Sequence, residues 1–174
     1  TTARAEARHR RRRALGSLAT VKVLITGATG FAGRHLCSYC LERDVQVHAV
    51  VRADRPDPAM GGVEVHPADL RDPDQVAAVI GRVRPDHVVH LAGASSVGQS
   101  FREPLPTWDI NLGGTLGVLE ALRAAAADTP ALLVTSGEVY GRVEVADLPV
   151  TEATPMRPLS PYGASKAAAD IAAR

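Results

Sequence analysis

A glycine-rich loop between an apolar segment and a helix-forming segment is the feature that most restricts what this chain can fold into. Residues 21–26 are apolar and rich in β-branched side chains, which predicts a strand, and residues 31–43 can form a helix. Between them, Gly27, Gly30 and Gly33 stand at every third position. Missing side chains there let the backbone approach a pyrophosphate at the helix N-terminus. A lone glycine triplet can be only a tight turn, but its place between strand and helix favours nucleotide binding.

Further strands are expected to alternate with helices along the rest of the chain. The segments with strand-like composition are 45–51, 63–66, 86–91 and 131–136. Residues 144–160 hold three prolines and are expected to form a loop. Strands that alternate with helices imply an α/β fold with a doubly wound, mostly parallel sheet of the Rossmann type.

Three more helices are expected. Asp72 and Pro73 form a favourable cap and first turn, and the apolar residues that follow keep helical spacing up to residue 83. Pro161 starts a last helix that runs to residue 174. Between these two, residues 111–127 form an alanine-rich helix, and its four leucines are expected to face the core: Leu112, Leu116, Leu119 and Leu122.

Composition fits one globular domain, because 45% of the 174 residues are hydrophobic and 22% are charged. No apolar stretch approaches the roughly 20 residues needed to cross a bilayer, so neither a membrane span nor a signal peptide is expected. Cys37 and Cys40 are too few for a disulfide scaffold and fall inside the first helix, which favours packing and a reduced, cytoplasmic protein. The six histidines lack metal-ligand spacing, and His87 and His90 are interpreted as structural, so no metal is expected.

Charge is distributed unevenly. Residues 1–19 hold six arginines and one glutamate, a local charge of +5, which leaves −4 for the other residues because the net charge is +1. A mildly acidic body argues against a specific nucleic-acid site. We expect residues 1–19 to be a basic, disordered tail and residues 20–174 to form the domain. Nonspecific contact of the tail with RNA or an anionic surface remains an alternative.

The end of the second strand bears on the choice of cofactor. An acidic residue there would hold the ribose 2′-hydroxyl of NAD, whereas an arginine accommodates the 2′-phosphate of NADP. The strand ends at Arg52, so NADP is favoured; Asp54, two residues further on, leaves NAD open. Arg34, just after the glycine loop, is either a second phosphate ligand or a solvated helix residue.

A tyrosine and a lysine at the start of the last helix form a candidate proton-transfer pair. Tyr162 and Lys166 are four residues apart, which places both on one face of a helix. A free tyrosine is a poor base near neutral pH, and a nearby ammonium favours its phenolate. Such a phenol can exchange a proton with a carbinol or ketone while hydride moves to or from a nicotinamide.

Polar residues at the carboxyl end of the fifth strand strengthen this interpretation, since ligands of open α/β sheets bind there. Ser136 could hydrogen-bond the reacting oxygen, and Glu138 could exchange a proton with a neighbouring carbon. The alternatives are capping of the strand end for Ser136 and a surface turn for Glu138.

Several motifs occur together in one order: the glycine loop, Asp69-Leu70, His90-Leu91-Ala92-Gly93, Asn111, the Ser-Gly-Glu-Val-Tyr-Gly of 136–141 and the Ser-Pro-Tyr-Gly-Ala-Ser-Lys of 160–166. The set resembles the extended short-chain dehydrogenase/reductase family, also called the NAD-dependent epimerase/dehydratase family, over about residues 21–174. Residues 95–104 and 111–116 are similar to GDP-mannose 4,6-dehydratases and GDP-4-keto-6-deoxymannose reductases. The Ser-Gly-Glu of 136–138 favours the reductases and counts against dTDP-glucose dehydratases, which usually carry Asp-Glu there.

The resemblance implies Ser136, Tyr162 and Lys166 as a catalytic triad. In a reductase Tyr162 would protonate a C4 ketone as NADPH delivers hydride, and in a dehydratase Glu138 would also take a proton from C5. Ser96, Ser136 and more weakly Ser100 would contact the nucleotide-sugar, a GDP-hexose. The cofactor would be bound by Gly27, Thr29, Gly30, Phe31, Gly33, Arg52, Asp69, Leu70, Leu91, Ala92, Gly93, Tyr162 and Lys166.

The end of the chain departs from the family pattern. Members continue past the last helix with another strand, a loop over the nicotinamide and a C-terminal substrate domain, and none of these follows residue 174 here. Three activities are therefore weighed: a reductase or dehydratase, a non-catalytic NAD(P)-binding fragment, and a nucleotide-sugar 4-epimerase. A homodimer through helices of the Rossmann domain is a further expectation.

Overall fold

The computed structural model describes residues 20–52 and 61–174. In this part of the chain, five strands form one sheet in the order β3-β2-β1-β4-β5, and every neighbouring pair is parallel. The chain starts at the centre, builds outward to β3, and then returns to the other side of β1. The Rossmann-type fold is thereby confirmed. The strands are β1 (Lys22–Thr26), β2 (Gln46–Val51), β3 (Val63–Pro67), β4 (His87–His90) and β5 (Ala131–Leu133).

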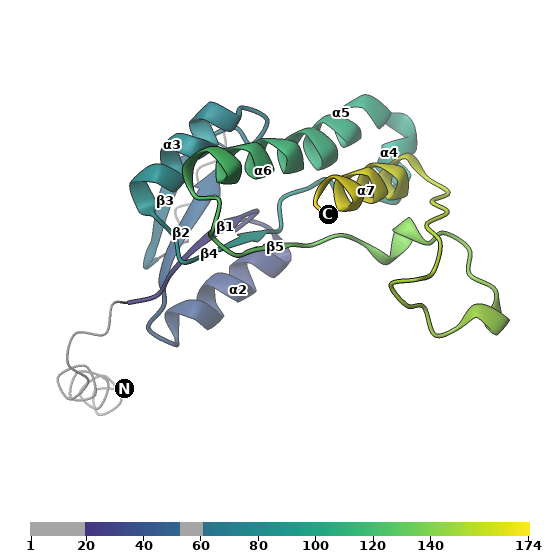
Figure 1. Cartoon of the computed structure of the whole chain (residues 1–174), viewed down its shortest axis with the longest axis horizontal. Helices are drawn as coiled ribbons and strands as arrows, with labels where there is room; N and C mark the ends of the chain where they lie inside the picture. Colours follow the sequence, from purple (N-terminus) through teal and green to yellow (C-terminus); the bar gives the residue numbers. More distant parts are fainter. Residues whose placement is uncertain (1–19, 53–60) are drawn as a thin grey trace.

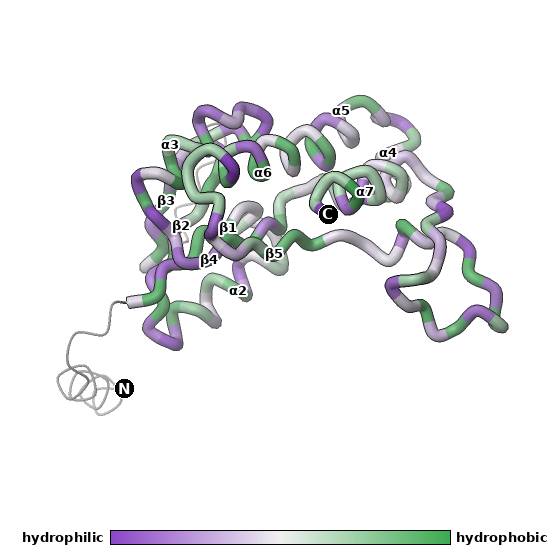
Figure 2. Tube along the Cα trace, in the orientation of Figure 1, coloured by the Kyte–Doolittle hydropathy of each residue, from purple (hydrophilic) through white to green (hydrophobic). Residues whose placement is uncertain are grey.

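Helices cover both faces of the sheet (Figure 1). On one face α2 (Phe31–Leu41) packs on side chains of β1 and β2, and Cys37 is buried in this cluster. On the other face α3 (Pro73–Val83) and α6 (Gly114–Ala125) bury the second apolar cluster. Among the described residues, the purple, hydrophilic stretches of the tube lie mostly in the peripheral turns (Figure 2). No helix in the described residues is long and apolar enough to cross a membrane.

The expected start of α3 is confirmed. The Asp72 carboxylate accepts hydrogen bonds from the backbone N–H groups of Asp74 and Gln75, and Pro73 occupies the first turn. The four apolar residues on its inner face are all buried: Val76, Val79, Ile80 and Val83.

The expectation that four leucines of residues 111–127 face the core is confirmed for Leu122, which is buried, and is wrong for Leu116, which is 42% exposed. Leu119 and Leu112, which precedes α6, are half-buried. The inner face of α6 instead carries small residues, because the helix lies very close to the turn after β3. A Cβ atom at Gly117 would stand 1.9 Å from the Leu70 carbonyl oxygen, so this contact admits only glycine.

Three short helical turns connect β4 to α6. They are α4 (Val97–Arg102), α5 (Pro104–Trp108) and a π-helical turn over Asp109–Gly113 that leads directly into α6. The last helix, α7 (Pro161–Ala172), packs against α4, α5 and the π-helical turn.

Beyond β5 the chain forms mostly loop. β5 ends three residues earlier than expected, and a short 3-10 turn, Gly137–Val139, follows it and contacts α7. The proline-containing stretch 144–160 is a loop, as predicted, with one more such turn, Val145–Asp147. It projects away from the sheet (Figure 1).

Candidate nucleotide-binding and catalytic site

A pocket of about 430 Å³ opens at the carboxyl ends of the strands. The glycine loop forms one wall, and the residues that end β2, β3 and β4 form the floor and the opposite walls. Ile110 and Gly114, where the π-helical turn meets α6, complete the lining. This is the position at which open parallel sheets bind ligands, next to the strand where the chain changes direction.

The glycine loop has the close contacts that the sequence spacing implies. Gly27 has a φ of +72°, and a Cβ atom there would lie 2.6 Å from the Ala92 backbone nitrogen. A Cβ atom at Gly33 would lie 2.2 Å from the Gly27 carbonyl oxygen, so α2 packs directly on the loop. Gly30 precedes α2 without a side-chain cap, and the first turn of the helix holds no acidic residue. The N-terminus of α2 therefore offers backbone N–H groups to an anion.

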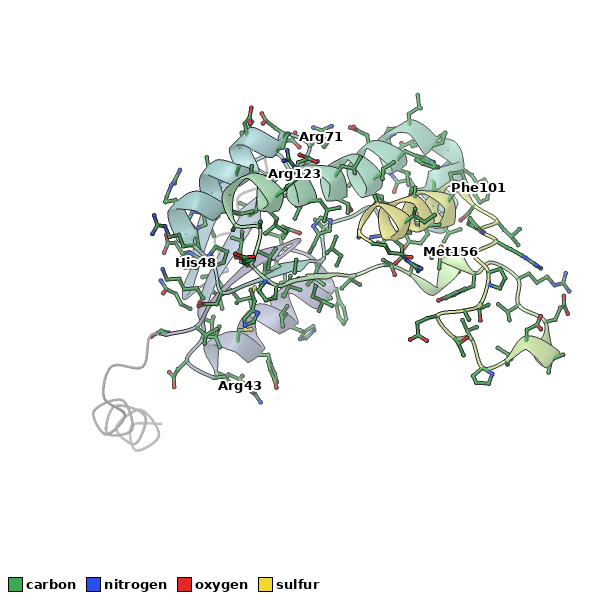
Figure 3. All side chains as sticks on the ribbon, in the orientation of Figure 1. Arg43, His48, Arg71, Phe101, Arg123 and Met156 are labelled. Carbon is green, nitrogen blue, oxygen red and sulfur yellow. The ribbon has the colours of Figure 1, made fainter. Side chains whose placement is uncertain are left out.

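The opposite end of the pocket is charged. Arg52, Asp69 and Arg71, the last labelled in Figure 3, line it. Arg71 donates hydrogen bonds to both Asp69 and Asp109. Hydrogen bonds from the Arg71 side chain and backbone hold the pKa of Asp69 at about 2, well below its ordinary value. The same contacts raise the pKa of Arg71. Arg71 thus joins the turn after β3 to the π-helical turn, which fixes two walls of the pocket.

Nine of the residues expected to bind the cofactor line this pocket. Among the others, Phe31 is 85% exposed at the start of α2, and Gly33 lies beneath the loop. Arg34 donates a hydrogen bond from Nε to the Thr29 carbonyl, so its guanidinium lies against the outside of the loop. Asp54 lies outside the described residues. The nine that line the pocket are Gly27, Thr29, Gly30, Arg52, Asp69, Leu70, Leu91, Ala92 and Gly93.

Lys166 does not line the pocket, but its side chain lies next to a residue that does. Its side chain is buried, Nζ donates a hydrogen bond to the Val134 carbonyl over 3.3 Å, and burial lowers its pKa. A Cβ atom at Gly93 would stand 3.1 Å from this Nζ. The ammonium therefore lies between the end of β5 and a residue that lines the pocket.

Tyr162 and the 136–138 turn lie on neighbouring elements. Tyr162 is buried in the first turn of α7, and the Glu138 carbonyl oxygen closely approaches Gly163 of the same turn. Ser136 accepts a hydrogen bond at Oγ from the Glu138 backbone N–H, so it caps the 3-10 turn that follows β5 and not the strand end itself. The Glu138 side chain is exposed, as in the surface-turn alternative.

The two serines considered for the substrate differ in accessibility. Ser96 is exposed and caps α4, accepting a hydrogen bond at Oγ from the Gln99 backbone N–H. Ser100 is fully buried and donates its hydroxyl to the Val97 carbonyl over 2.7 Å. Contact of Ser100 with a sugar is therefore not supported, because its hydroxyl points into its own helix.

A buried hydrogen-bond network, which the sequence did not reveal, links the pocket to α7. Asn111, on the π-helical turn, is fully buried and bonds both backbone groups of Ala94, accepting from N–H and donating to C=O. It also donates to Ser165 Oγ over 2.9 Å, and Ser165 in turn donates to the Tyr162 carbonyl. The available signal was a polar side chain within an otherwise apolar helical pattern.

His90 continues this network toward the glycine loop. Its Nδ1 lies 2.7 Å from Thr26 Oγ1 and its Nε2 lies 3.2 Å from Thr115 Oγ1. Thr115 donates its only hydroxyl hydrogen to the Asn111 carbonyl, so it accepts from His90 Nε2–H, and Nδ1 accepts from Thr26. Burial, followed by the Lys166 charge, lowers the pKa of His90 to about 4. A structural role is thus confirmed for His90, whereas His87 is exposed.

A five-stranded parallel sheet with this loop and this tyrosine–lysine helix defines a Rossmann-type domain of the short-chain dehydrogenase/reductase kind. The family model described as GDP-mannose 4,6-dehydratase matches residues 24–174, and the chain belongs to this family. The resemblance inferred from the motifs is thereby confirmed.

Curated relatives and solved structures agree with this assignment. A GDP-6-deoxy-D-mannose reductase of Pseudomonas aeruginosa is 37% identical over 87% of this chain and 45% of its own length. A GDP-mannose 4,6-dehydratase of Vibrio cholerae is 34% identical over 82% and 42%. The structure of the Thermus thermophilus UDP-glucose 4-epimerase in complex with NAD has a TM-score of 0.78 and 34% identity, over 88% of this chain and 50% of that one. The chain thus spans about half the length of the relatives it matches.

Proposed function

We propose that this chain forms the cofactor-binding and proton-transferring part of an NADP-dependent nucleotide-sugar reductase or dehydratase that acts at C4 of a GDP-hexose. The observation that carries the proposal is the position of Lys166. Its ammonium lies behind Gly93 in the pocket wall, one helical turn from Tyr162. A cation so placed is suited to assist proton transfer by a phenol next to a bound cofactor.

The pocket fits a dinucleotide. Gly27 and Gly33 let the loop pack closely on Ala92 and on α2, and the absence of acid in the first turn of α2 favours a pyrophosphate at its N-terminus. Asp69 and Leu70 line the other end, where an adenosine would bind. The nicotinamide of such a cofactor would supply or accept the hydride.

Arg52 supports NADP over NAD. It is exposed at the end of β2 and lines the pocket, where a 2′-phosphate of the adenosine ribose would lie. Its charge also helps to lower the pKa of Asp69, so the two side chains are near each other. Asp69 is already bonded to Arg71, which leaves it less suited to hold a ribose hydroxyl.

Each side chain then has a distinct role. Tyr162 holds the proton that is exchanged with the C4 oxygen, and Lys166 supplies positive charge beside it. Ser136 orients the same oxygen through its hydroxyl. Glu138, which forms no hydrogen bond or ion pair through its side chain within the described residues, is the base for C5 in a dehydratase.

The test combines binding and turnover. NADPH and NADH are titrated into the 174-residue chain, with Trp108 fluorescence and the melting temperature as readouts. Protein that contains this chain is then assayed with GDP-mannose and with GDP-4-keto-6-deoxymannose. We expect tighter binding of NADPH and turnover of one of the two sugars. Binding of NADPH without any turnover would favour the non-catalytic alternative, and absence of binding would refute the proposal.

The chain offers a matched control, because Lys22 is its only other lysine and it too donates a hydrogen bond to a backbone carbonyl, that of Val83. Lys166→Met should abolish turnover and leave the fold intact, whereas Lys22→Met should keep turnover. Glu138→Gln should abolish dehydration and spare a reductase.

A UDP-sugar 4-epimerase is the second candidate. It is favoured by the likeness to the Thermus thermophilus enzyme, whose identity to this chain approaches that of the reductase and dehydratase relatives. Assays with UDP-glucose beside the GDP-sugars separate the two candidates by the nucleotide-sugar that is converted, and only a reductase would consume NADPH during turnover.

Association of two copies through the helices of this domain is also proposed, as is a cytoplasmic location. Leu116 lies on the outer face of α6 and is 42% exposed, which suits an apolar contact. Leu116→Ser should shift a dimer toward monomer in light scattering after size-exclusion chromatography, and an unchanged mass would contradict the use of this face.

A further inference from the structure

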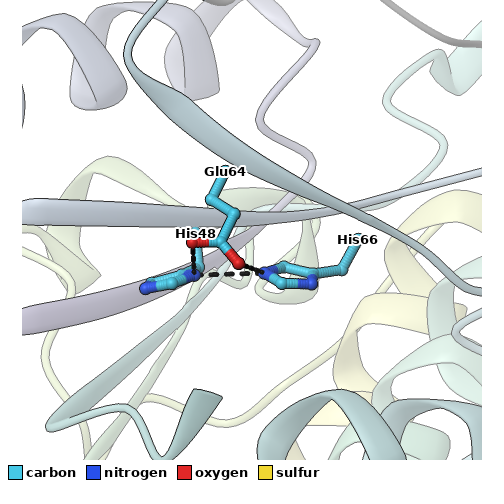
Figure 4. Close-up of side chains that lie close together, drawn as sticks. All are labelled: His48, Glu64 and His66. Atoms are coloured by element: carbon cyan, nitrogen blue, oxygen red, sulfur yellow. Dashed lines mark hydrogen bonds and ion pairs between the residues drawn. The ribbon is translucent and has the colours of Figure 1, made fainter. Parts of the chain in front are cut away.

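Two histidines and a glutamate meet on adjacent strands, away from the proposed catalytic residues (Figure 4). His48 belongs to β2, and Glu64 and His66 belong to β3. His48 Nδ1 lies 3.1 Å from His66 Nε2. One Glu64 carboxylate oxygen lies 3.6 Å from that His48 atom, and the other lies 3.6 Å from the His66 atom.

The register of the sheet explains this meeting. Parallel pairing sets His48 opposite Glu64, and His66 follows two residues later on the same strand, so all three side chains share one face. Helix α3 covers this face. Val50, two residues after His48 and therefore on the same face of the sheet, packs in the apolar cluster that contains the buried residues of α3. Along the chain the two histidines are 18 residues apart, which is why their spacing resembles no metal motif.

The two rings are almost fully buried on the strands that hold them, and burial lowers the pKa of each imidazole. Lys22 and Arg82 add to this lowering and Glu64 opposes it. The Glu64 side chain is 58% exposed and provides a path from solvent. It is also the only negative charge in contact with the rings among the described residues.

Hydrogen bonding alone accounts poorly for the geometry. A single bond between the rings satisfies the 3.1 Å contact but leaves the carboxylate at 3.6 Å from both, beyond a good hydrogen bond. His48 Nε2 is buried with no partner among the described residues, so Nδ1 is the ring nitrogen that makes the contacts of this cluster. Four ligands about 2.0–2.1 Å from a zinc ion in a tetrahedron are separated by roughly 3.3–3.4 Å, which lies between the observed distances.

We propose that His48, Glu64 and His66 form a binding site for a divalent transition-metal ion of the zinc class. His48 Nδ1, His66 Nε2 and the Glu64 carboxylate, which faces each ring nitrogen with one oxygen, supply the protein ligands, and a water molecule on the exposed side completes the site. This donor set of two imidazoles and one carboxylate suits zinc, nickel or copper better than magnesium or calcium.

Such an ion joins the edge strand β3 to β2 and closes the chain between residues 48 and 66. Closing a loop in the folded state favours that state over the unfolded chain. Two residues further along the chain in each case, Val50 in β2 and Ala68 just after β3 line the nucleotide pocket. The ion would therefore hold together the two strands that carry the adenosine side of the pocket, and its role is structural.

The probe is Zn²⁺ added to the metal-free, full 174-residue chain, with bound zinc measured by equilibrium dialysis and stability by melting temperature. We expect one ion per chain and a melting temperature that rises with zinc concentration. Co²⁺ should give the visible absorption of a tetrahedral centre. The absence of zinc binding, or binding with no change in melting temperature, would overturn the proposal.

Variants distinguish this site from nonspecific binding of zinc to other histidines. His87→Gln removes one exposed histidine and should bind zinc as the unaltered chain does. His48→Gln and His66→Gln should lose the site. Glu64→Gln changes an exposed side chain, so it should fold, and it should weaken binding by about tenfold or more, since loss of an outer partner alone costs about 10- to 100-fold. Equal affinity of Glu64→Gln and His87→Gln would refute the assignment even if the buried variants misfold.

Discussion

Asn111 Nδ2 donates a hydrogen bond to Ser165 Oγ over 2.9 Å and thereby joins the π-helical turn before α6 to the helix that carries Tyr162 and Lys166. The same amide bonds both backbone groups of Ala94 in the pocket wall. One buried side chain thus fixes the position of the proposed proton-transfer pair relative to the pocket.

Asn111→Ala should lower the free energy of unfolding by about 1–3 kcal/mol, because it removes the partner of the buried Ser165 hydroxyl and of the half-buried Ala94 backbone groups. Urea denaturation followed by circular dichroism measures the change. Gln99→Ala, which removes only an exposed bond to Glu103, is the control and should shift stability by about 0.5 kcal/mol or less. A similar loss in the two variants would show that Asn111 is not a structural clamp.

Stability should decrease as the pH is lowered from about 6.5 to about 4. His90 has its pKa lowered from 6.5 to about 4 in the folded chain, so the unfolded state binds a proton first and is favoured in this range. The loss from His90 is about 3 kcal/mol in order of magnitude. His48 and His66 act with the same sign.

Imidazole NMR separates these contributions, because it assigns the proton of each ring. We expect neutral His90 with its hydrogen on Nε2 down to pH 5. A protonated His90 at pH 6 would contradict the hydrogen-bond network.

Arg52→Gln should reduce the preference for NADPH over NADH. If Arg52 contacts the 2′-phosphate, loss of a charge-assisted hydrogen bond of about 1.5–3 kcal/mol weakens NADPH binding by roughly tenfold or more and leaves NADH binding nearly unchanged. Fluorescence titration measures both constants. Arg123→Gln, which loses an exposed ion pair on α6 outside the pocket lining, should leave both unchanged.

Gly33→Ala should unfold the chain or abolish cofactor binding, since the new Cβ atom would lie 2.2 Å from the Gly27 carbonyl oxygen. Gly81→Ala in α3 is the matched control, because nothing lies within 4 Å of its Cβ position. It should stabilise the chain by about 0.5–1 kcal/mol through helix propensity. Melting temperatures with and without NADPH measure both effects, and a normal, NADPH-responsive melt for Gly33→Ala would refute the packing argument.

The strands, the glycine loop and the cap of α3 were predictable because each depends on residues close together in the sequence. The β-branched runs, the triplet of glycines and the Asp72-Pro73 pair act over a few residues. The leucines of α6 were not predictable in the same way. Helical spacing identifies candidate faces, but the close approach of Gly117 to Leu70 selected the face with small residues.

The same distinction between local and long-range interactions applies to the candidate site. The sequence by itself determined the fold class, the family and the positions of Gly27, Tyr162 and Lys166, because these follow from local spacing. Only the tertiary structure placed the Lys166 ammonium next to Gly93 and buried Ser100. It also set Asn111 between the π-helical turn and α7, and it brought His48 close to Glu64 and His66. Strand register and helix approach decide such contacts, and both arise from packing between segments far apart along the chain.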